Sequence, residues 1–308
     1  MNFRIGVDIG GTNTVIGLVD ENGQIVRKES IPTRNKAVFN DYINDIVNSI
    51  HSICSNNEKL LGIGVGAPNG NIYKGTIEFA PNLPWKGVLP IKELLSKAFD
   101  LPVFITNDAN AAAMGEKLFG GAKNMNDFIV ITLGTGVGSG IYVNGNIVYG
   151  HDGFAGEIGH VITIPNGRKC ACGRLGCIEA YASAQGIVTT FRELKKQYPN
   201  AAYQGVKEEL DTKIIYDLAC KGNECAIKAF DETARLLGLT IANSIAYTSP
   251  EAVFIFGGIS NAADFLLQPL RNYLDEFILP IYKGNVRILR SELKESDVAI
   301  LGASALVN

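Results

Sequence analysis

The sequence predicts an α/β protein built from two related lobes. With 308 residues, the chain exceeds the usual size of a single hydrophobic core. Short apolar runs that end in glycine or asparagine turns alternate with amphipathic helical segments, a pattern typical of sheets covered by helices. The order strand, glycine turn, strand and Asn-Gly hairpin occurs at 3–26 and again at 128–148, which indicates a weak internal duplication. Together these observations favour two lobes of similar construction.

The expected elements follow in order along the chain. FRIGVDIG predicts a strand, and the next hairpin has its turn at Glu21-Asn22-Gly23. From Val38 to Cys54 apolar residues recur every three or four positions, which predicts an amphipathic helix. LLGIGVGAP and LPVFITNDAN predict buried strands whose ends reach a ligand-binding surface. The last third predicts helix from Asp211 to Tyr247, a strand in PEAVFIFGGIS, and helices in FLLQPLRNYLDEFIL and DVAILGASALV.

Composition excludes several classes of protein. A hydrophobic content of 46% and a charged content of 19% are ordinary for a globular protein. The net charge is −3 and no basic run occurs, so nucleic acid is not an expected partner. No apolar stretch reaches membrane-spanning length, and MNFRIGVDIGG does not resemble a signal peptide. We therefore expect a cytoplasmic protein without a membrane partner, in which six cysteines are a poor basis for disulfides.

One histidine and three cysteines lie close together in a loop rich in glycine. His160, Cys170, Cys172 and Cys177 form the pattern H-x9-C-x-C-x4-C, which supplies the four ligands of a closed, structural Cys3His zinc site. Gly173 and Gly176 allow the tight turns that a loop around a small ion needs. The alternative is that these are ordinary loop thiols near an unrelated histidine. The spacing favours zinc.

Three glycine turns follow expected strands and are candidates for binding phosphate or nucleotide. In DIGGTNT, Gly10 and Gly11 let backbone amides approach phosphate oxygens, Thr12 adds a hydroxyl, and Asp8 can hold a hydrated magnesium ion. TLGTGVGSG at 132–140 offers a second group of amides, and FGGIS a third, against which an adenine ring can lie. Hairpins also need glycine for conformational reasons alone, and FGGIS is equally compatible with a simple tight turn.

Polar residues with the chemistry of sugar phosphorylation follow other strands. Asn107 and Asp108 come directly after a buried strand, where an Asp can accept a proton from an attacking hydroxyl and an Asn can bind a sugar. Asp108 is also compatible with a helix N-cap. Glu157 and Glu179 flank the cysteine loop and suit vicinal hydroxyls. Asn82, with Trp85, can complete a polyol pocket, although Asn-Leu-Pro is also an ordinary turn.

These motifs together resemble the ROK family (repressors, open reading frames and sugar kinases), most closely its bacterial glucokinase branch. The matching stretches span nearly the whole chain: DIGGT, PNLPW, TNDANAAA, LGTGVGSG, AGEIGH, CACGRLGCIEAYAS and FGGIS. The resemblance implies a two-lobed actin-like ATPase (ribonuclease H-like) fold with an inserted zinc-binding loop. It also implies ATP with Mg²⁺, a structural Zn²⁺, phosphorylation of a hexose hydroxyl, usually on C6, and a homodimer. We expect a smaller lobe of 1–118 plus 296–308 and a larger lobe of 119–295.

The resemblance also assigns roles to individual positions. Asp108 resembles the catalytic base of the family. The positions that resemble its sugar contacts are Asn82, Asn107, Asp108, Glu157, His160 and Glu179. Those that resemble its zinc ligands are His160, Cys170, Cys172 and Cys177. The expected phosphate and nucleotide positions are Asp8, Gly10, Gly11, Thr12, Thr135, Gly136, Gly257 and Gly258.

Two positions depart from the family pattern. Asn13 stands where many members have the lysine of GGTK, which removes a cation near the phosphates. Asn69 replaces the glycine of GxPG, which requires either a left-handed backbone at this residue or an altered loop. The reaction class is unaffected by either change.

Two rival functions remain open from the sequence. Kinases for fructose, allose, N-acetylmannosamine or N-acetylglucosamine share these motifs, and pocket shape decides between them. A sugar-sensing transcriptional regulator is the rival from another class. It is disfavoured because the phosphate loop begins at Asp8, which leaves no preceding DNA-binding domain, and because no basic surface signal occurs.

Overall fold

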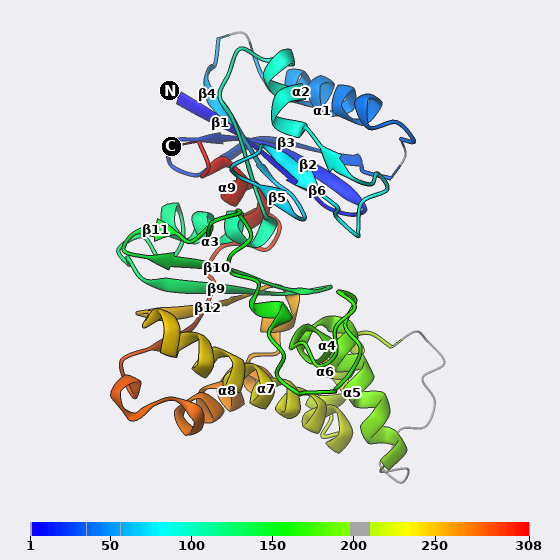
Figure 1. The fold of residues 1–308 in the computed structure, drawn as a ribbon, viewed down its shortest axis with the longest axis vertical. Coiled ribbons are helices and arrows are strands. Elements are labelled where there is room, and N and C mark those ends of the chain that lie inside the picture. Colours follow the sequence, from blue (N-terminus) through cyan, green and yellow to red (C-terminus); the bar gives the residue numbers. More distant parts are fainter. Residues whose placement is uncertain (1, 35, 56, 198–209, 308) are drawn as a thin grey trace. The chain divides into compact units, whose positions relative to one another are not determined.

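Two compact units make up the part of the chain that the structure, a computed structural model, describes, namely residues 2–34, 36–55, 57–197 and 210–307 (Figure 1). The first unit consists of Met1–Asn126, Gly140–Gly156 and Ser291–Asn308. The second consists of Asp127–Ser139 and Glu157–Arg290.

A five-stranded sheet with the order β3-β2-β1-β4-β8 forms the centre of the first unit. Its strands are β1 (Asn2–Ile9), β2 (Asn13–Asp20), β3 (Ile25–Pro32), β4 (Lys59–Gly66) and β8 (Val103–Thr106). The first three strands are antiparallel neighbours, whereas β1, β4 and β8 run parallel. A small second sheet contains β5 (Gly70–Asn71), β6 (Thr76–Glu78) and β7 (Val88–Leu89). The carboxyl ends of β1, β4 and β8 therefore meet at one edge.

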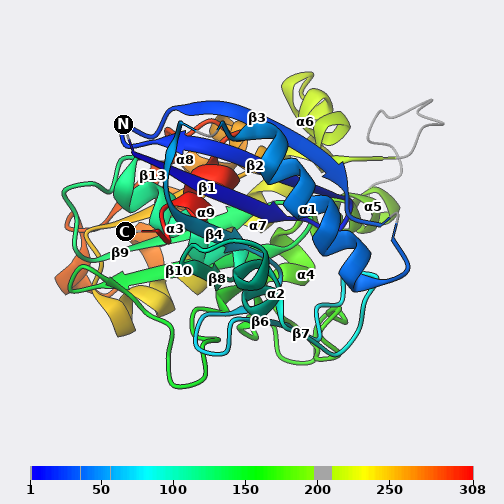
Figure 2. The same ribbon diagram turned by 90° about the horizontal axis from the view of Figure 1, so that it is seen from above.

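Helices cover both faces of this sheet. The helices α1 (Phe39–Ile53) and α2 (Ile91–Ala98) lie on one face, as the view from above shows (Figure 2). On the opposite face α9 (Val298–Ser304) packs against β1 and β4, and α3 (Asp108–Leu118) packs against α9 (Figure 1). The amphipathic helix predicted over Val38 to Cys54 is confirmed as α1.

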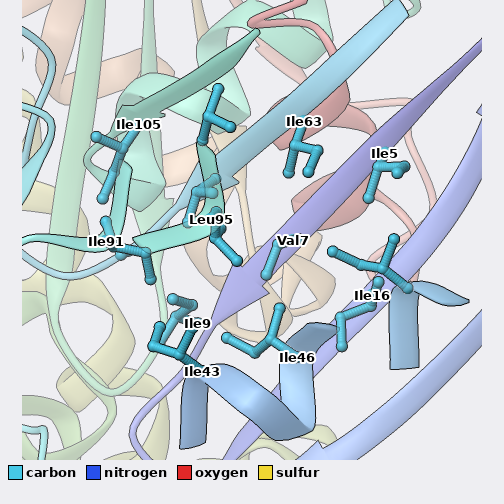
Figure 3. Close-up of a cluster of buried hydrophobic side chains, with 14 of the residues drawn as sticks. Ile5, Val7, Ile9, Ile16, Ile43, Ile46, Ile63, Ile91, Leu95 and Ile105 are labelled. Carbon is cyan, nitrogen blue, oxygen red and sulfur yellow. The ribbon is translucent and has the colours of Figure 1, made fainter. Parts of the chain in front are cut away.

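Aliphatic side chains fill the space between the sheet and the first two helices (Figure 3). Val7 and Ile9 of β1 point toward Ile43 and Ile46 of α1, and Leu95 of α2 joins the same cluster. Each of these five side chains is at most 5% exposed. A fully buried aliphatic side chain contributes about 1.5–3 kcal/mol, so this cluster holds the strand that carries Asp8 firmly in the sheet.

The last helix approaches the sheet closely because the strands offer glycine. A Cβ atom on Gly6 of β1 would overlap the carbonyl oxygen of Ile300, and one on Gly64 of β4 would overlap that of Ala303. Both partners lie in α9, the small-residue helix predicted at DVAILGASALV. The C-terminal segment is thus an integral part of the first unit.

The second sheet repeats the strand order of the first, as the internal duplication predicts. Its order is β11-β10-β9-β12-β13, which corresponds element by element to β3-β2-β1-β4-β8. The strands are β9 (Phe128–Leu133), β10 (Val137–Val143), β11 (Asn146–Ile147), β12 (Ala252–Phe256) and β13 (Arg287–Arg290). Asn144 and Gly145 form the turn between β10 and β11, with φ of 51° and 75°. Both positive values fit the type I′ turn that Asn-Gly favours.

Within the second sheet, β9, β12, β13 and the start of β10 belong to the second unit, whereas the end of β10 and β11 belong to the first. The other described elements of the second unit are helices. They are η1 (Ile158–His160), α4 (Glu179–Ala182), α5 (Ala184–Gln197), α6 (Thr212–Cys220), α7 (Glu224–Thr248), η2 (Gly258–Asn261), α8 (Ala263–Phe277) and η3 (Pro280–Tyr282). The helix α7 contacts both α5 and α8 and buries residues along its length, which fixes this helical layer. Among the described residues, none of the helices combines the length and apolar character that crossing a bilayer requires.

We expect Gly64→Ala to destabilise the protein by at least about 2 kcal/mol, because the added methyl group has no space beside the backbone of α9. Urea unfolding of the variant and the wild type measures the change. Gly134→Ala is the matched control, since a Cβ atom there meets no atom within 4 Å. Equal stability of Gly64→Ala and the wild type would contradict the close packing of α9.

Candidate active site

Two carboxylates lie at the carboxyl edge of the first sheet. Asp8 is near the end of β1, and Asp108 is the first residue of α3, two positions after β8. Asp8 is in register with Gly66 of β4, and Gly66 is in register with Thr106 of β8. The parallel strands thus bring the two acidic positions to the same edge, although 100 residues separate them in sequence.

Burial disfavours the charged form of both carboxylates, and repulsion adds to this effect at Asp8. Burial raises the pKa of Asp8 from 3.8 to about 7, and the negative charge of Asp108 adds to the rise. Burial also raises the pKa of Asp108, while the backbone amide of Ala109 donates to Oδ1 at 2.8 Å and lowers it. Solvent still reaches the Asp108 side chain. A pair with raised pKa values is suited to proton transfer and to a divalent cation that would relieve the repulsion.

Asn107, and not Asp108, is the N-cap of α3. Oδ1 of Asn107 accepts hydrogen bonds from the amides of Ala109 at 2.7 Å and Asn110 at 3.1 Å. The N-cap interpretation of Asp108 is therefore wrong by one residue. Since the cap occupies the amide oxygen of Asn107, this side chain offers its NH2 group to a ligand. The capping also leaves the Asp108 carboxylate available at the helix N-terminus.

The first glycine turn lies beside the loop that carries Asn82. The amide of Gly10 donates to the carbonyl oxygen of Asn13 at 3.0 Å, which closes the turn. A Cβ atom on Gly11 would lie 3.0 Å from the carbonyl oxygen of Asn82. Thr12 and Asn82 are both exposed. The structure thus brings together, within one unit, residues that we expected to contact phosphate and residues that we expected to contact sugar.

The backbone at Asn69 is left-handed, with φ of 52°. Its side-chain amide donates to the carbonyl oxygen of Glu78 at 2.9 Å, and its own carbonyl oxygen accepts from the Glu78 amide at 3.1 Å. Asparagine tolerates this conformation better than most residues. The first of the two alternatives for this departure from the family pattern is therefore the observed one.

Trp85 does not line a polyol pocket, contrary to our expectation. It is 8% exposed and belongs to the hydrophobic core of the first unit. Its ring lies 4.5 Å from that of Tyr42 and 5.2 Å from that of Phe39, measured between centroids. The large apolar area of an indole favours this burial over exposure to a sugar.

A buried hydrogen-bond network beneath the first glycine turn escaped the sequence analysis. Oγ1 of Thr14 lies 2.9 Å from Oγ1 of Thr33 and 2.5 Å from the hydroxyl of Tyr42. All three residues are buried, and burial raises the pKa of Tyr42. The sequence holds one signal for it: Tyr42 lies four residues before Ile46, on the buried face of α1. The network fixes the start of β2 directly after the turn.

In the second unit, Glu179 contacts the second glycine turn. Its Oε2 accepts from the amide of Val137 at 3.1 Å, and a Cβ atom on Gly136 would lie 2.6 Å from the same oxygen. The amide of Gly138 donates to Oγ1 of Thr132 at 3.2 Å, and Thr135 at the tip is exposed. Glu179 is thus part of the wall of a candidate phosphate loop as well as a candidate sugar ligand.

The third glycine turn lies next to the second. The strand β12 runs parallel to β9, with Phe256 in register with Thr132. Gly257 has φ of 102°, and a Cβ atom on it would overlap the carbonyl oxygen of Leu133. Gly258 begins the following 3-10 turn, η2. A side chain at position 257 would therefore separate the two turns, which explains the need for glycine.

The four expected zinc ligands converge, and their ligand atoms all lie within 4.8 Å of one another. The Sγ atoms of Cys172 and Cys177 are 3.7 Å apart, and Nδ1 of His160 is 3.7 Å from Sγ of Cys170. Two thiolates held about 2.3 Å from a tetrahedral zinc ion would be about 3.8 Å apart. The donor set and its spacing fit a structural zinc ion.

The zinc cluster also contacts both candidate sugar carboxylates. Nε2 of His160 lies 4.0 Å from Oε2 of Glu157, on the ring edge opposite to Nδ1. Sγ of Cys170 lies 3.5 Å from Oε1 of Glu179. A carboxylate beside the second nitrogen of a histidine is the arrangement that orients a zinc ligand, and His160 with Glu157 fits it. The contact of Cys170 with Glu179 needs the thiol proton, which a zinc-bound thiolate lacks.

Arg168 anchors the zinc loop and was not singled out from the sequence. Its guanidinium donates to Oγ1 of Thr190 at 2.9 Å, lies over the ring of Tyr181 at 4.5 Å, and pairs with Glu193. Its backbone amide donates to the Tyr181 hydroxyl at 2.7 Å. These contacts join the loop to α4 and α5, and α4 begins at Glu179. No local sequence signal predicts such an anchor, because its partners lie 13–25 residues away.

A profile of the ROK family matches residues 4–308, and the chain belongs to this family. The chain is 38% identical to a glucokinase of Thermotoga maritima over 309 residues, which cover 98% of this chain and 96% of that relative. The fold resembles the crystal structure of a ROK family glucokinase from Streptomyces griseus in complex with glucose and AMPPNP, with a TM-score of 0.82, 32% identity and 99% of both chains covered. It also resembles a ROK family transcriptional regulator, a homologue of the E. coli MLC protein, with a TM-score of 0.89 and 26% identity. That match covers 99% of this chain and 77% of the regulator.

The expected fold is confirmed by these likenesses. The chain has the two-lobed actin-like ATPase fold of ROK kinases. The two sheets of identical strand order are the common element of that architecture. The zinc-ligand loop lies in the second unit, between η1 and α4.

We expect Asp8→Asn to stabilise the protein at pH 8 in the absence of magnesium. The pKa of Asp8 is about 7 in the folded state and near 3.8 when unfolded, so the folded state binds the proton more tightly. The stabilisation from this group is complete below pH 4 and is lost as pH rises through 7, by up to about 4 kcal/mol. Urea unfolding at pH 5 and pH 8 measures it. The wild type should lose more stability than the variant between these pH values, and magnesium should stabilise only the wild type; parallel pH profiles would contradict the assignment.

We expect Cys172→Ser to lose bound zinc and to lower the thermal midpoint by several degrees, because removing one ligand opens the site. Metal analysis of the purified protein and thermal unfolding measure the two effects. Cys220→Ser is the matched control, since Cys220 is an exposed thiol outside the cluster. A Cys172→Ser protein that keeps one zinc ion per chain would exclude this site.

Proposed function

We propose that this chain is an ATP-dependent hexose kinase, specifically a glucokinase that converts glucose and ATP to glucose 6-phosphate and ADP. The chain is 38% identical to a relative named glucokinase, over nearly the full length of both. A structure with 32% identity contains glucose and AMPPNP, a non-hydrolysable ATP analogue. These likenesses support the proposal, and the geometry of the candidate site supplies the chemistry.

The observation that carries the proposal is the position of Asp108. Its carboxylate stands at the N-terminus of α3, beside Asn107 and at the edge of the sheet where Asp8 also lies. The raised pKa of Asp108 makes it a stronger base when it is ionised. We assign it the role of accepting the proton of the attacking hydroxyl.

The proposed step transfers one phosphoryl group. The C6 oxygen of glucose bonds to the γ-phosphorus of ATP while its proton passes to Asp108, and the bond between the γ-phosphorus and the bridging oxygen breaks to release ADP. The protonated Asp108 then returns its proton to solvent. Positioning and electrostatic stabilisation supply most of the rate in such transfers, so the protein must hold both substrates rather than react covalently.

The glycine turns suit the nucleotide. In the first unit we assign phosphate contacts to Gly10, Gly11 and Thr12, and in the second to Thr135 and Gly136. We assign Gly257 and Gly258 to the adenine side, as the family resemblance implies. Asp8 would hold Mg²⁺, whose charge would offset that of the phosphates and would lower the pKa of Asp8, which burial and Asp108 raise.

The remaining polar residues suit the sugar. We assign hydroxyl contacts to the side chains of Asn82, Asn107, Asp108, Glu157, His160 and Glu179. The zinc ligand His160 would bind the metal through Nδ1, which directs Nε2 toward Glu157. We propose a structural role for zinc, in which the loop keeps His160 and Glu179 preorganised for the sugar.

Asp108→Asn should reduce kcat by at least about 10³-fold, because the amide cannot accept the proton in the transition state. Glucose affinity should stay within about tenfold, since the amide keeps the shape and most hydrogen bonds of the carboxylate. A coupled assay of ADP release and calorimetric glucose binding measure the two quantities. Asp45→Asn, which changes a surface ion pair with Lys36, is the control. Unchanged turnover in Asp108→Asn would refute the base assignment.

A sugar-responsive regulator is the second candidate, because the fold matches a ROK regulator with a TM-score of 0.89. A coupled assay with ATP across glucose, fructose, allose, mannose, N-acetylmannosamine and N-acetylglucosamine distinguishes the candidates. A kinase gives ADP with at least one hexose, whereas a regulator binds sugar without turnover.

The family resemblance also supports a cytoplasmic homodimer. Analytical sedimentation would measure the mass of the assembly.

A further inference from the structure

The side chain of Arg34 lies on the first glycine turn. Arg34 comes two residues after β3, and its Nε donates to the carbonyl oxygen of Gly11 at 2.6 Å. A Cβ atom on Gly11 would lie 3.8 Å from Nη2 of Arg34 and 3.0 Å from the carbonyl oxygen of Asn82. The guanidinium therefore stands where the glycine turn and the Asn82 loop meet, all within the first unit.

The residue that precedes Arg34 is held firmly in place. Thr33 is buried, its amide donates to the carbonyl oxygen of Thr12 at 2.9 Å, and its hydroxyl lies 2.9 Å from that of Thr14. The residue before Arg34 is thus bonded to the glycine turn through its backbone and to the start of β2 through its side chain. A cation attached to such a point is preorganised, which lowers the entropy that ligand binding costs.

The two terminal nitrogens of the guanidinium are available to a ligand. Among the described residues, no hydrogen bond or ion pair occupies Nη1 or Nη2 of Arg34, and the side chain is exposed. The nearby Lys36 differs, because it pairs with Asp45 at 3.2 Å. Asn13, also at this turn, is neutral and exposed. Arg34 is therefore the cation that this turn offers to an anion.

We propose that Arg34 binds a phosphoryl group at the first glycine turn, which makes it a substrate-binding residue of the kinase. The Nε bond to Gly11 orients the planar guanidinium, and its two terminal nitrogens are the fork that pairs with two oxygens of one phosphate. The inference rests on the proposed function for the identity of the ligand, which is the triphosphate of the donor nucleotide. Because Asn13 is neutral, the charge at this turn is supplied from position 34.

The test distinguishes two roles of Arg34: binding phosphate through its charge, and bracing, in which its hydrogen bond to Gly11 only stabilises the turn. Arg34→Gln removes the cation, Asn13→Lys restores one at the same turn, and the double variant combines them. Lys36→Gln is the matched control, since it removes a cation two residues away that already has a partner. Calorimetry without sugar measures the binding of ATP and of tripolyphosphate. Steady-state kinetics measure KM for ATP and kcat. The thermal midpoint of unfolding measures bracing.

The proposal predicts that Arg34→Gln weakens tripolyphosphate and ATP binding by about 10- to 100-fold, the usual effect of losing a charge-assisted pair. Its thermal midpoint should stay within about 2 °C of that of the wild type, and Asn13→Lys should recover at least a third of the loss on a logarithmic scale. Lys36→Gln should bind both ligands as the wild type does. A large fall in thermal midpoint with no recovery in the double variant would overturn the proposal and assign Arg34 to bracing alone.

Tripolyphosphate binding tests the role of Arg34 independently of the kinase activity. If the wild type phosphorylates no hexose but binds tripolyphosphate less well after Arg34→Gln, the proposed kinase activity fails and the phosphate role of Arg34 stands. If hexose phosphorylation is found and Arg34→Gln binds and turns over ATP as the wild type does, the kinase stands and the role of Arg34 is refuted.

Discussion

The candidate site of the first unit depends on two carboxylates, Asp8 and Asp108, at one edge of its sheet. The charge of Asp108 raises the pKa of Asp8, at an edge where burial already raises the pKa of both. The parallel strands β1, β4 and β8 hold them there, and the aliphatic core behind β1 prevents the sheet from relaxing. Because ionisation at this edge is unfavourable, a bound cation is favoured there, and the magnesium ion of a nucleotide complex can supply it.

The two sheets have the same strand order, but the glycine turns at their edges differ in charge. In the duplicated pattern, Asp8 of DIGGT corresponds to Thr132 of TLGTG, so the acidic residue of the first turn has a neutral counterpart. Thr132 accepts from the amide of Gly138, and Glu179 accepts from that of Val137. The first turn thus combines a carboxylate with amides and suits a cation with phosphate. In the second turn the amides of Val137 and Gly138 are already occupied, and the exposed Thr135 lies near a single acid, which suits the uncharged parts of the substrates as well as phosphate.

The sequence predicts what depends on local pattern and fails where distant residues meet. The zinc ligands, the glycine turns and the strand ends were predictable because spacing and periodicity within short segments define them. The N-cap of α3 was misassigned by one position, since Asn107 and Asp108 are both good caps and only the geometry decides between them. Trp85 was misplaced because its burial depends on Tyr42 and Phe39, far away in the chain. Arg34 and Arg168 were missed for the same reason.

A structural metal is a reasonable solution for the loop from 161 to 178. Three large apolar side chains of this segment, Val161, Ile162 and Leu175, are at least 39% exposed, so the loop buries little core of its own. Hydrogen bonds alone seldom hold such a segment in one conformation, because each contributes only about 1 kcal/mol net. Four metal bonds at residues 160–177 can do so. Glu179 lies two residues after Cys177 and accepts from the Val137 amide, which connects that order to the second glycine turn. The loop therefore influences the candidate phosphate site through one carboxylate, without contributing a residue that itself reacts.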